Sequence, residues 1–195
     1  TAAEKVKTDL TVTGTAMVSG SAVTATSADT DGQTLTAGTA SITVSKDASS
    51  PVTAIVYDNQ TVTTLAAKFD AVTAGYNITD MTVTVGASAN TVVQSVMIYD
   101  GATLVAQGPM TTSTTAVFNG LSVNVPANSN KVLTVKLQLG TVGVGAGTTG
   151  ATLTTSIAAA TDVIYTNTST GVSTSNSTEE AGTATGSTTY VYASI

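Results

Sequence analysis

The sequence contains no cysteine and no histidine. Without cysteine, the chain has neither a disulfide framework nor a thiolate metal site. Without histidine, it lacks Ser-His-Asp and Cys-His catalysis, the imidazole ligands of most zinc sites and a pH switch near neutrality. The composition therefore predicts no catalytic residues, no cofactor and no metal centre.

Charged residues are also scarce. They make up 9% of the chain, with 6 Lys+Arg against 12 Asp+Glu and a net charge of -6. Nucleic acid is not expected as a partner, because phosphate neutralisation requires clustered basic side chains. A surface solvated by hydroxyl and amide groups is typical of secreted β-proteins, so we expect an extracellular or cell-surface location. The first residue, Thr1 rather than Met, suits a processed or truncated product.

Long apolar runs and aromatic side chains are missing as well. No apolar run approaches the roughly 20 residues that a membrane-spanning helix requires, so we predict no membrane span. Aromatic residues are 4% of the chain, and none is Trp. Glycosidases place two carboxylates in a cleft, usually with aromatic platforms for the sugar. Because this chain has few residues for such platforms, the sequence predicts that it is not an enzyme.

Residues that favour strands are abundant. Hydrophobic residues are 42% of the chain, and Thr accounts for roughly one residue in five. Branched side chains of this kind pack well on pleated surfaces, whereas the strong helix formers Glu, Lys and Arg are few. Short alternating runs, punctuated by Gly, Pro, Asn and Asp, recur every 8 to 12 residues, as in sandwiches. We predict an all-β, immunoglobulin-like β-sandwich of the Greek-key type, with an extra N-terminal strand.

Two hairpins are predicted from alternation and turn residues. Residues 118–139 place seven apolar side chains on one face, with a turn after Pro126: these are Leu121, Val123, Val125, Leu133, Val135, Leu137 and Leu139. Residues 92–106 form the second, because Asp100-Gly101 favours a two-residue turn. We interpret the first hairpin as the centre of the sandwich.

An alternating segment, residues 10–18, precedes the predicted sandwich. Its sequence, LTVTGTAMV, places one set of small or apolar residues on a single face: Leu10, Val12, Gly14, Ala16 and Val18. We predict an N-terminal arm over residues 1–33 that carries this segment, followed by a sandwich domain over residues 34–195.

Residues 41–157 resemble the immunoglobulin-like modules of bacterial and archaeal surface-layer and cell-wall proteins. The resemblance lies in LAAKFDA, ITDMTVTV, VMIYDGATLVA and FNGLSVNVPANSNKVLTVKLQL. It implies a sandwich fold at the cell surface. Such modules act as spacers, lattice subunits or ligand binders, so the resemblance by itself does not select one function.

The alternating segment resembles the donor strands of fimbrial subunits, which complete a neighbour's sandwich. This resemblance implies a structural subunit of an extracellular filament or surface layer, joined head-to-tail to copies of itself by donor-strand exchange. The alternative for the segment is pairing within its own domain. The alternative function is an adhesin or carbohydrate-binding module whose loops, near Asp100-Gly101 and residues 166–178, contact glycans.

Three further motifs each allow a functional interpretation and a purely structural one. Sequons for N-glycosylation occur in predicted turns or loops, at Asn59, Asn77, Asn167 and Asn176, and several sequons arise by chance in a Thr-rich chain. Asp29-Thr30-Asp31-Gly32 resembles the front of a calcium loop, but it lacks the closing Glu and is interpreted as a turn. Glu179-Glu180 is interpreted as a solvated loop edge.

Overall fold

The computed structural model describes residues 5–6, 13–15, 22–24, 35–36, 38–87, 89–174 and 179–194. The chain divides into two compact units, Thr1–Thr39 and Ala40–Ile195. The sequence placed this boundary between residues 33 and 34. Asp29, Thr30, Asp31 and Gly32 lie outside the described residues.

The first unit contains two short antiparallel pairs. β1 (Lys5–Val6) pairs with β4 (Leu35–Thr36), and β2 (Thr13–Thr15) pairs with β3 (Ala22–Thr24). Gly14 lies opposite Val23 in the second pair. The alternating segment is therefore described only at its centre, and Leu10, Val12, Ala16 and Val18 lie outside the described residues.

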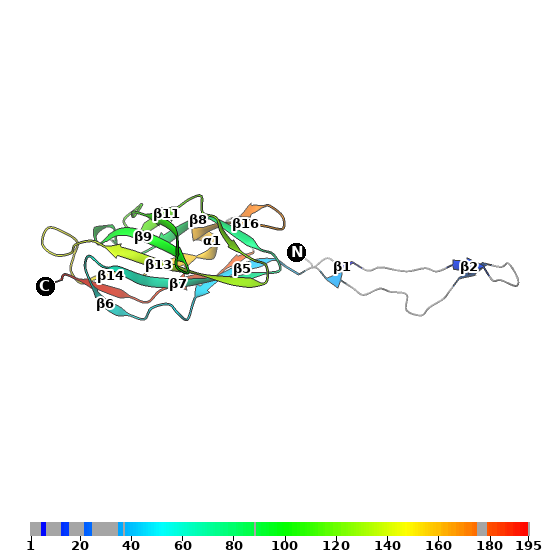
Figure 1. Ribbon diagram of the computed structural model, residues 1–195, viewed down its shortest axis with the longest axis horizontal. Coiled ribbons are helices and arrows are strands. Elements are labelled where there is room, and N and C mark those ends of the chain that lie inside the picture. Colours follow the sequence, from blue (N-terminus) through cyan, green and yellow to red (C-terminus); the bar gives the residue numbers. More distant parts are fainter. Residues whose placement is uncertain are drawn as a thin grey trace. The chain divides into compact units, whose positions relative to one another are not determined.

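The second unit is built from two large sheets and one small sheet (Figure 1). The first large sheet has the order β10-β9-β13-β7-β5-β18, with bounds Thr103–Gly108, Val93–Asp100, Ser129–Leu139, Thr61–Val72, Ser41–Lys46 and Glu180–Ala181. The facing sheet has the order β17-β16-β8-β15-β19, with bounds Ser173–Thr174, Val163–Asn167, Tyr76–Thr84, Ser156–Ala158 and Thr183–Thr185. β11 (Thr115–Phe118) and β12 (Val123–Val125) also pair with β8.

The small sheet and two short helical turns complete this unit. The small sheet has the order β14-β20-β6, with bounds Ala151–Leu153, Thr189–Tyr192 and Ala54–Tyr57. The helical turns are η1 (Ala89–Thr91) and α1 (Ala159–Asp162). In the described part of the chain, no helix has the length and apolar character needed to cross a membrane.

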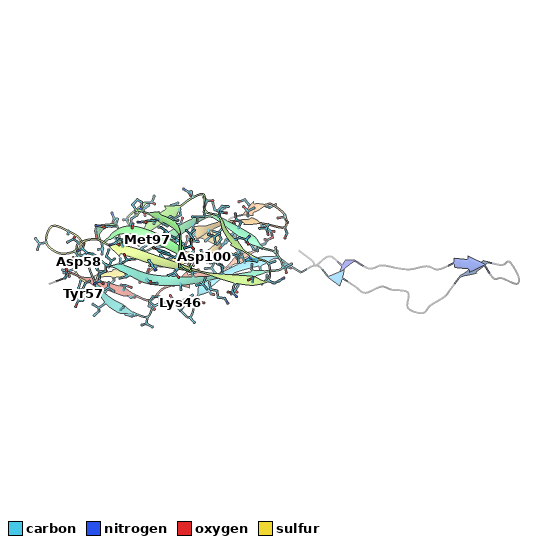
Figure 2. The ribbon with its side chains drawn as sticks, viewed as in Figure 1. Lys46, Tyr57, Asp58, Met97 and Asp100 are labelled. Carbon is cyan, nitrogen blue, oxygen red and sulfur yellow. The ribbon has the colours of Figure 1, made fainter. Side chains whose placement is uncertain are left out.

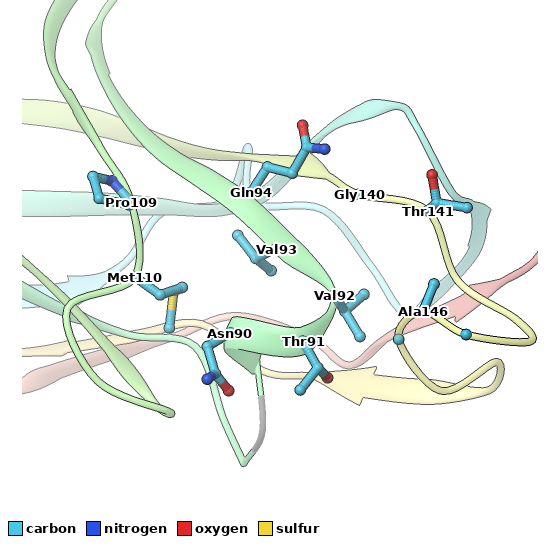
Figure 3. Close-up of a pocket in the computed structure, with 12 residues that line it drawn as sticks. Asn90, Thr91, Val92, Val93, Gln94, Pro109, Met110, Gly140, Thr141 and Ala146 are labelled. Atoms are coloured by element: carbon cyan, nitrogen blue, oxygen red, sulfur yellow. The ribbon is translucent and has the colours of Figure 1, made fainter.

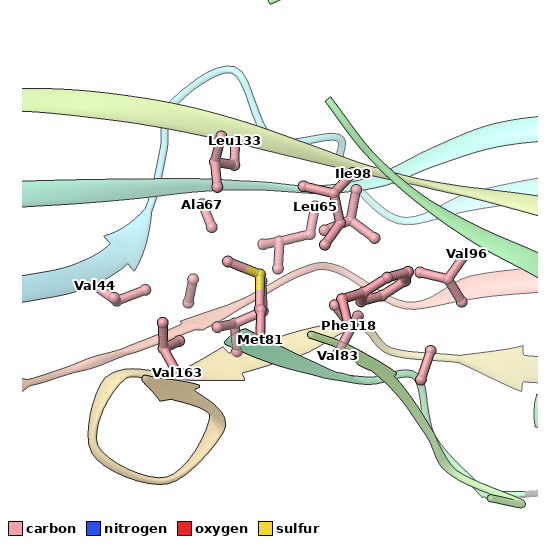
Figure 4. Close-up of a cluster of buried hydrophobic side chains, with 14 of the residues drawn as sticks. Val44, Leu65, Ala67, Met81, Val83, Val96, Ile98, Phe118, Leu133 and Val163 are labelled. Carbon is pink, nitrogen blue, oxygen red and sulfur yellow. The ribbon is translucent and has the colours of Figure 1, made fainter. Parts of the chain in front are cut away.

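A single hydrophobic core fills the space between the two large sheets. Leu65 and Leu133 enter it from the first sheet, and Met81 and Phe118 enter it from the facing sheet (Figure 4). Each strand contributes alternate residues, because successive side chains of a strand point to opposite faces. The chain thus forms the all-β sandwich that its composition predicts.

The connectivity follows a Greek key. β13 lies between β7 and β9 and runs antiparallel to both. The chain visits the facing sheet in β8 before it forms β9 and β10, and it visits that sheet again in β11 and β12. β13 then returns to fill the position beside β7, which is the long return connection of this motif.

The predicted hairpin over residues 118–139 is wrong, although its seven apolar side chains are all buried. β12 pairs with β8 in one sheet, whereas β13 pairs with β7 and β9 in the other. The turn after Pro126 therefore crosses between the sheets. Asn128 supports this crossing with a left-handed φ of 55° and accepts a hydrogen bond from the N–H of Thr73 at 2.9 Å. Alternation identified the buried face but not the partner strand.

Two other local predictions have opposite outcomes. The hairpin over residues 92–106 is confirmed, because β9 pairs with β10 and Asp100 lies opposite Thr103. Its two loop residues are Gly101 and Ala102, one position later than predicted. The segment around Asn77, predicted as a turn or loop, instead begins β8, the strand on which the facing sheet is built.

Candidate functional site

The small sheet has one buried face and one exposed aromatic face. Thr189 and Val191 of β20 point inward and are buried. The opposite face carries a group of exposed side chains that we call the tyrosine face: Ile55 (67% exposed), Tyr57 (50%), Tyr190 (36%) and Tyr192 (42%). The register places Tyr190 beside Ile55 and Tyr192 beside Tyr57. Three of the chain's 6 Tyr residues therefore share one outward surface.

β6 is the outermost strand of the small sheet, and among the described residues it pairs with β20 alone. The N–H of Ala54 donates to the carbonyl of Thr188 at 3.3 Å, and that of Asp58 donates to Tyr192 at 3.0 Å. Successive N–H groups of a strand point to opposite edges. The N–H groups of Ile55 and Tyr57 therefore point toward the open edge.

The core is not closed beneath this edge. Because Ile55 and Tyr57 point outward, Ala54 and Val56 point inward, toward the side where β20 buries Val191. Val56 is only partly buried, and Ala54 is exposed. The inward surface of β6 thus lacks the cover that its neighbour has.

The edge of β6 lacks most of the usual protections against strand addition. Sheet edges are commonly protected by charged residues, Pro, bulges or very short strands. β6 has the sequence AIVY, with no charged residue, Pro or bulge, although at 4 residues it is a short strand. β10, at one end of the first large sheet, has a bulge between Leu104 and Ala106 and is followed by Pro109. Of these two outer strands, β6 is the one with neither a bulge nor a Pro directly after it.

Asp58 fixes the end of β6. Its Oδ1 accepts a hydrogen bond from the N–H of Ser194 at 3.0 Å, and its Oδ2 accepts one from the N–H of Val142 at 3.1 Å. Hydrogen bonds from Ser194 and from Val142 hold the pKa of the Asp58 carboxyl below its usual value. This one carboxylate ties the end of β6 to the loop after β13 and to the segment after β20, beside Tyr57 (Figure 2).

A hollow of about 680 Å³ lies between η1, the start of β9 and the loop after β13. Its lining includes Asn90, Val92, Met110, Thr141 and Gly147 (Figure 3). No charged residue occurs among the described residues that line it. The hollow offers hydroxyl, amide and backbone groups, but no side chain of the kind that carries acid–base catalysis.

A polar cluster in the facing sheet involves Glu179. Its Oε2 accepts hydrogen bonds from the hydroxyl of Tyr76 at 2.8 Å and from the Nδ2 of Asn167 at 3.4 Å. Glu180 is 6% exposed and lies in β18, paired in parallel with β5. The prediction of a solvated loop edge is therefore wrong, because Glu180 is buried in an outer strand of the first large sheet and Glu179, just before that strand, is hydrogen-bonded to the facing sheet.

The described sequon residues occupy different environments. Asn59 is exposed in the turn after β6, has a φ of 56° and accepts a hydrogen bond from the Thr141 hydroxyl. Asn77 is partly buried within β8, and Asn167 is 3% exposed at the end of β16. A turn or loop is thus correct for Asn59 and wrong for Asn77 and Asn167, while Asn176 lies outside the described residues.

The tyrosine face joins two runs that lie far apart in the sequence, and neither run by itself indicates the face. AIVY is a short continuous apolar run, and Tyr190 and Tyr192 stand two positions apart in a second short run. Their parallel pairing joins segments more than 130 residues apart (Ala54 to Thr189), and no turn signal marks such a pair. Asp100-Gly101, expected in a loop that contacts glycans, lies at the β9–β10 turn, where Asp100 forms an ion pair with Lys131.

No protein-family model matches the chain, and no curated protein matches it. Among solved structures, the chain is similar to a family 123 glycoside hydrolase from Clostridium perfringens, with a TM-score of 0.37 and 8% sequence identity. The match covers 81% of this chain and 28% of the other. The chain therefore spans little more than a quarter of the length of that enzyme.

This match contradicts the prediction that the chain is not an enzyme, because the matching protein is a hydrolase. We withdraw that prediction. A likeness with a TM-score of 0.37 carries no argument about substrate, catalytic residues or reaction, so no activity is transferred to this chain.

Proposed function

We propose that the chain is a structural subunit of an extracellular filament or surface layer, which assembles head-to-tail with copies of itself by donor-strand exchange. The observation that carries the proposal is the division of the chain into a sandwich and a separate N-terminal unit that contains the alternating segment. A fold of this kind supplies a rigid body, and the N-terminal unit supplies the connecting strand.

The physical basis is strand addition. An open sheet edge presents unpaired N–H and C=O groups, and an added strand satisfies them while its alternate side chains cover apolar surface. A contact between two different surfaces of the same subunit leaves one free donor and one free acceptor at the ends, so repeated addition produces a linear polymer or a lattice when the rotation between neighbours does not close a ring.

The proposal is tested by deleting residues 1–18 and measuring polymer length by electron microscopy and light scattering. Deletion of residues 1–9 is the matched control, because it shortens the same terminus but keeps the alternating segment. We expect polymers from the full chain and from the control, and none from the longer deletion. Polymers of unchanged length after deletion of residues 1–18 would rule out donor-strand exchange.

The tyrosine face favours a second candidate function, which is the binding of a glycan. Exposed aromatic rings on one surface stack against the apolar faces of sugar rings, and their hydroxyl groups reach sugar hydroxyls. Glycan-array binding by the unassembled chain tests this function, with Tyr190→Ala and Tyr192→Ala as variants. Tyr99→Ala is the control, because Tyr99 lies on another sheet beneath the Nζ of Lys136 at 4.4 Å. Binding that persists in both variants would exclude the tyrosine face.

A further inference from the structure

We infer that the open edge of β6 is the surface on which the sandwich receives the alternating segment of a second copy of the chain. This inference rests on the proposed function and assigns its receiving edge, which the sequence did not identify. The occupant is residues 10–18 of the neighbour.

The backbone of β6 matches this partner. The N–H groups of Ile55 and Tyr57 point away from β20 toward the open edge, where the described chain provides no paired strand. An incoming strand supplies carbonyl groups for them. The segment LTVTGTAMV contains no Pro, so no N–H is missing along it. Thr13–Thr15 pairs with β3 along one edge, and the opposite edge of the segment is the one that pairs with β6 in this arrangement.

The side chains match as well. An added strand with its apolar residues inward covers Ala54 and Val56, which β20 leaves open on that side. Its Thr residues then lie on the outer side, in line with Ile55 and Tyr57. Both partners are uncharged over this stretch, so pairing does not bury an unpaired charge. Gly14 falls at the centre of the inward set, where a small residue allows close approach.

The edge is positioned to receive a strand. Asp58 anchors the end of β6 through Val142 and Ser194, so the edge is held in place before pairing. Because little ordering of β6 is then required, little conformational entropy is lost on its side of the contact. Val52, exposed at 79% just before the strand, extends the apolar surface beyond β6 itself.

Ile55→Lys tests the edge in the full chain, with Leu104→Lys as the matched control. Both substitutions replace an exposed aliphatic residue on an outer strand with Lys. We expect Ile55→Lys to shorten polymers at least tenfold and Leu104→Lys to leave them unchanged. Normal polymers from Ile55→Lys, together with none after deletion of residues 1–18, would overturn this inference and leave the proposed function intact. Normal polymers from Ile55→Lys and also from the deletion of residues 1–18 would refute the inference and the proposed function together. Equal shortening by Ile55→Lys and Leu104→Lys would also reject β6 as the receiving edge.

Hydrogen exchange provides a second test that needs no substitution. We expect the N–H groups of Ile55 and Tyr57 to exchange at least tenfold more slowly in the assembled chain than in the unassembled chain. Equal exchange in the two states would overturn the inference. If slow exchange persists after deletion of residues 1–18, the edge of β6 pairs with another strand, such as β6 of a second copy. That result would also overturn the inference.

Discussion

Tyr76 and Tyr165 meet edge to face in the facing sheet, with ring centroids 6.2 Å apart and an interplanar angle of 78°. Their hydroxyl groups differ sharply. The hydroxyl of Tyr76 donates to Glu179, whereas that of Tyr165 is buried without a hydrogen-bond partner among the described residues. Burial raises the pKa of both hydroxyl groups above the usual value, so both are neutral at pH 7.

Removing these two hydroxyl groups has opposite expected effects. Tyr76→Phe loses a hydrogen bond to a charged group and lowers the free energy of unfolding by about 1.5–3 kcal/mol. Tyr165→Phe removes an unsatisfied polar atom, so the free energy of unfolding stays equal or rises by up to about 1 kcal/mol. Urea unfolding of the two variants measures both effects. Equal destabilisation would show that the Tyr165 hydroxyl has a partner.

Asp58 makes stability depend on pH in the acidic range. Because its pKa is lowered in the folded chain, its stabilising effect is complete above the unfolded value, near 3.8, and is lost as pH falls through the folded value. We expect Asp58→Asn to lower Tm at pH 7 and to reduce the loss of Tm between pH 5 and pH 2. Asp70→Asn is the control, since Asp70 forms only a surface ion pair with Lys68. An identical pH dependence in wild type and Asp58→Asn would contradict this role.

A comparison of Leu133 with Leu104 shows how far the effect of a Leu→Ala substitution on stability depends on burial. Leu133 is fully buried between the sheets, whereas Leu104 is 45% exposed on β10. Leu133→Ala should lower the free energy of unfolding by about 2–5 kcal/mol. Leu104→Ala should change it by less than about 0.5 kcal/mol. Denaturant titration of both variants gives the comparison, and similar losses would place Leu104 in a buried environment.

Gly182 should resist substitution more strongly than Gly171. Both have a left-handed φ, 88° and 70°, so Ala is strained at either position. A Cβ on Gly182 would also collide with the carbonyl oxygen of Val44, while one on Gly171 meets no atom within 4 Å. We expect Gly171→Ala to cost about 1 kcal/mol and Gly182→Ala clearly more. Equal Tm values for the two variants would mean that the backbone of β5 shifts to accommodate the added methyl group.

Asn167 should remain unmodified even if the chain is glycosylated elsewhere. Its Nδ2 donates to Glu179, and its Oδ1 accepts hydrogen bonds from the N–H groups of Ser169 and Thr170. A glycan on this buried Nδ2 would break that network. Mass spectrometry of the chain from its source should find unmodified Asn167, whatever the state of the exposed Asn59. A glycan at Asn167 in folded chains would show that the end of β16 opens.

The sequence predicts which side chains are buried more reliably than which strands pair. Val123, Val125 and Leu133 alternate with polar residues, and all three are buried as the period of two requires. Their strands lie in opposite sheets, because a short Asn-containing turn serves a crossing as well as a hairpin. In contrast, the Gly101 turn between β9 and β10 is a two-residue connection of the hairpin type, so that pairing was predictable.

The candidate interaction surface was only partly predictable for the same reason. Tyr190 and Tyr57 belong to runs whose exposure depends on parallel pairing between distant parts of the chain. Glu180 is buried because β18 adds to β5, which a pair of adjacent acidic residues does not reveal. In both cases pairing between distant segments decides which side chains of a strand are exposed or buried, and for β18 it decides that a strand forms at all.

The parallel pairs at the margins of the sandwich have a mechanical consequence. β6 runs parallel to β20, and β5 runs parallel to β18, so the first two strands of this unit are joined to strands near its end. Tension between the two ends pulls each parallel pair lengthwise in opposite directions, which loads its hydrogen bonds together rather than one after another. The survival of a stretched subunit then depends on its unfolding rate rather than on its equilibrium stability.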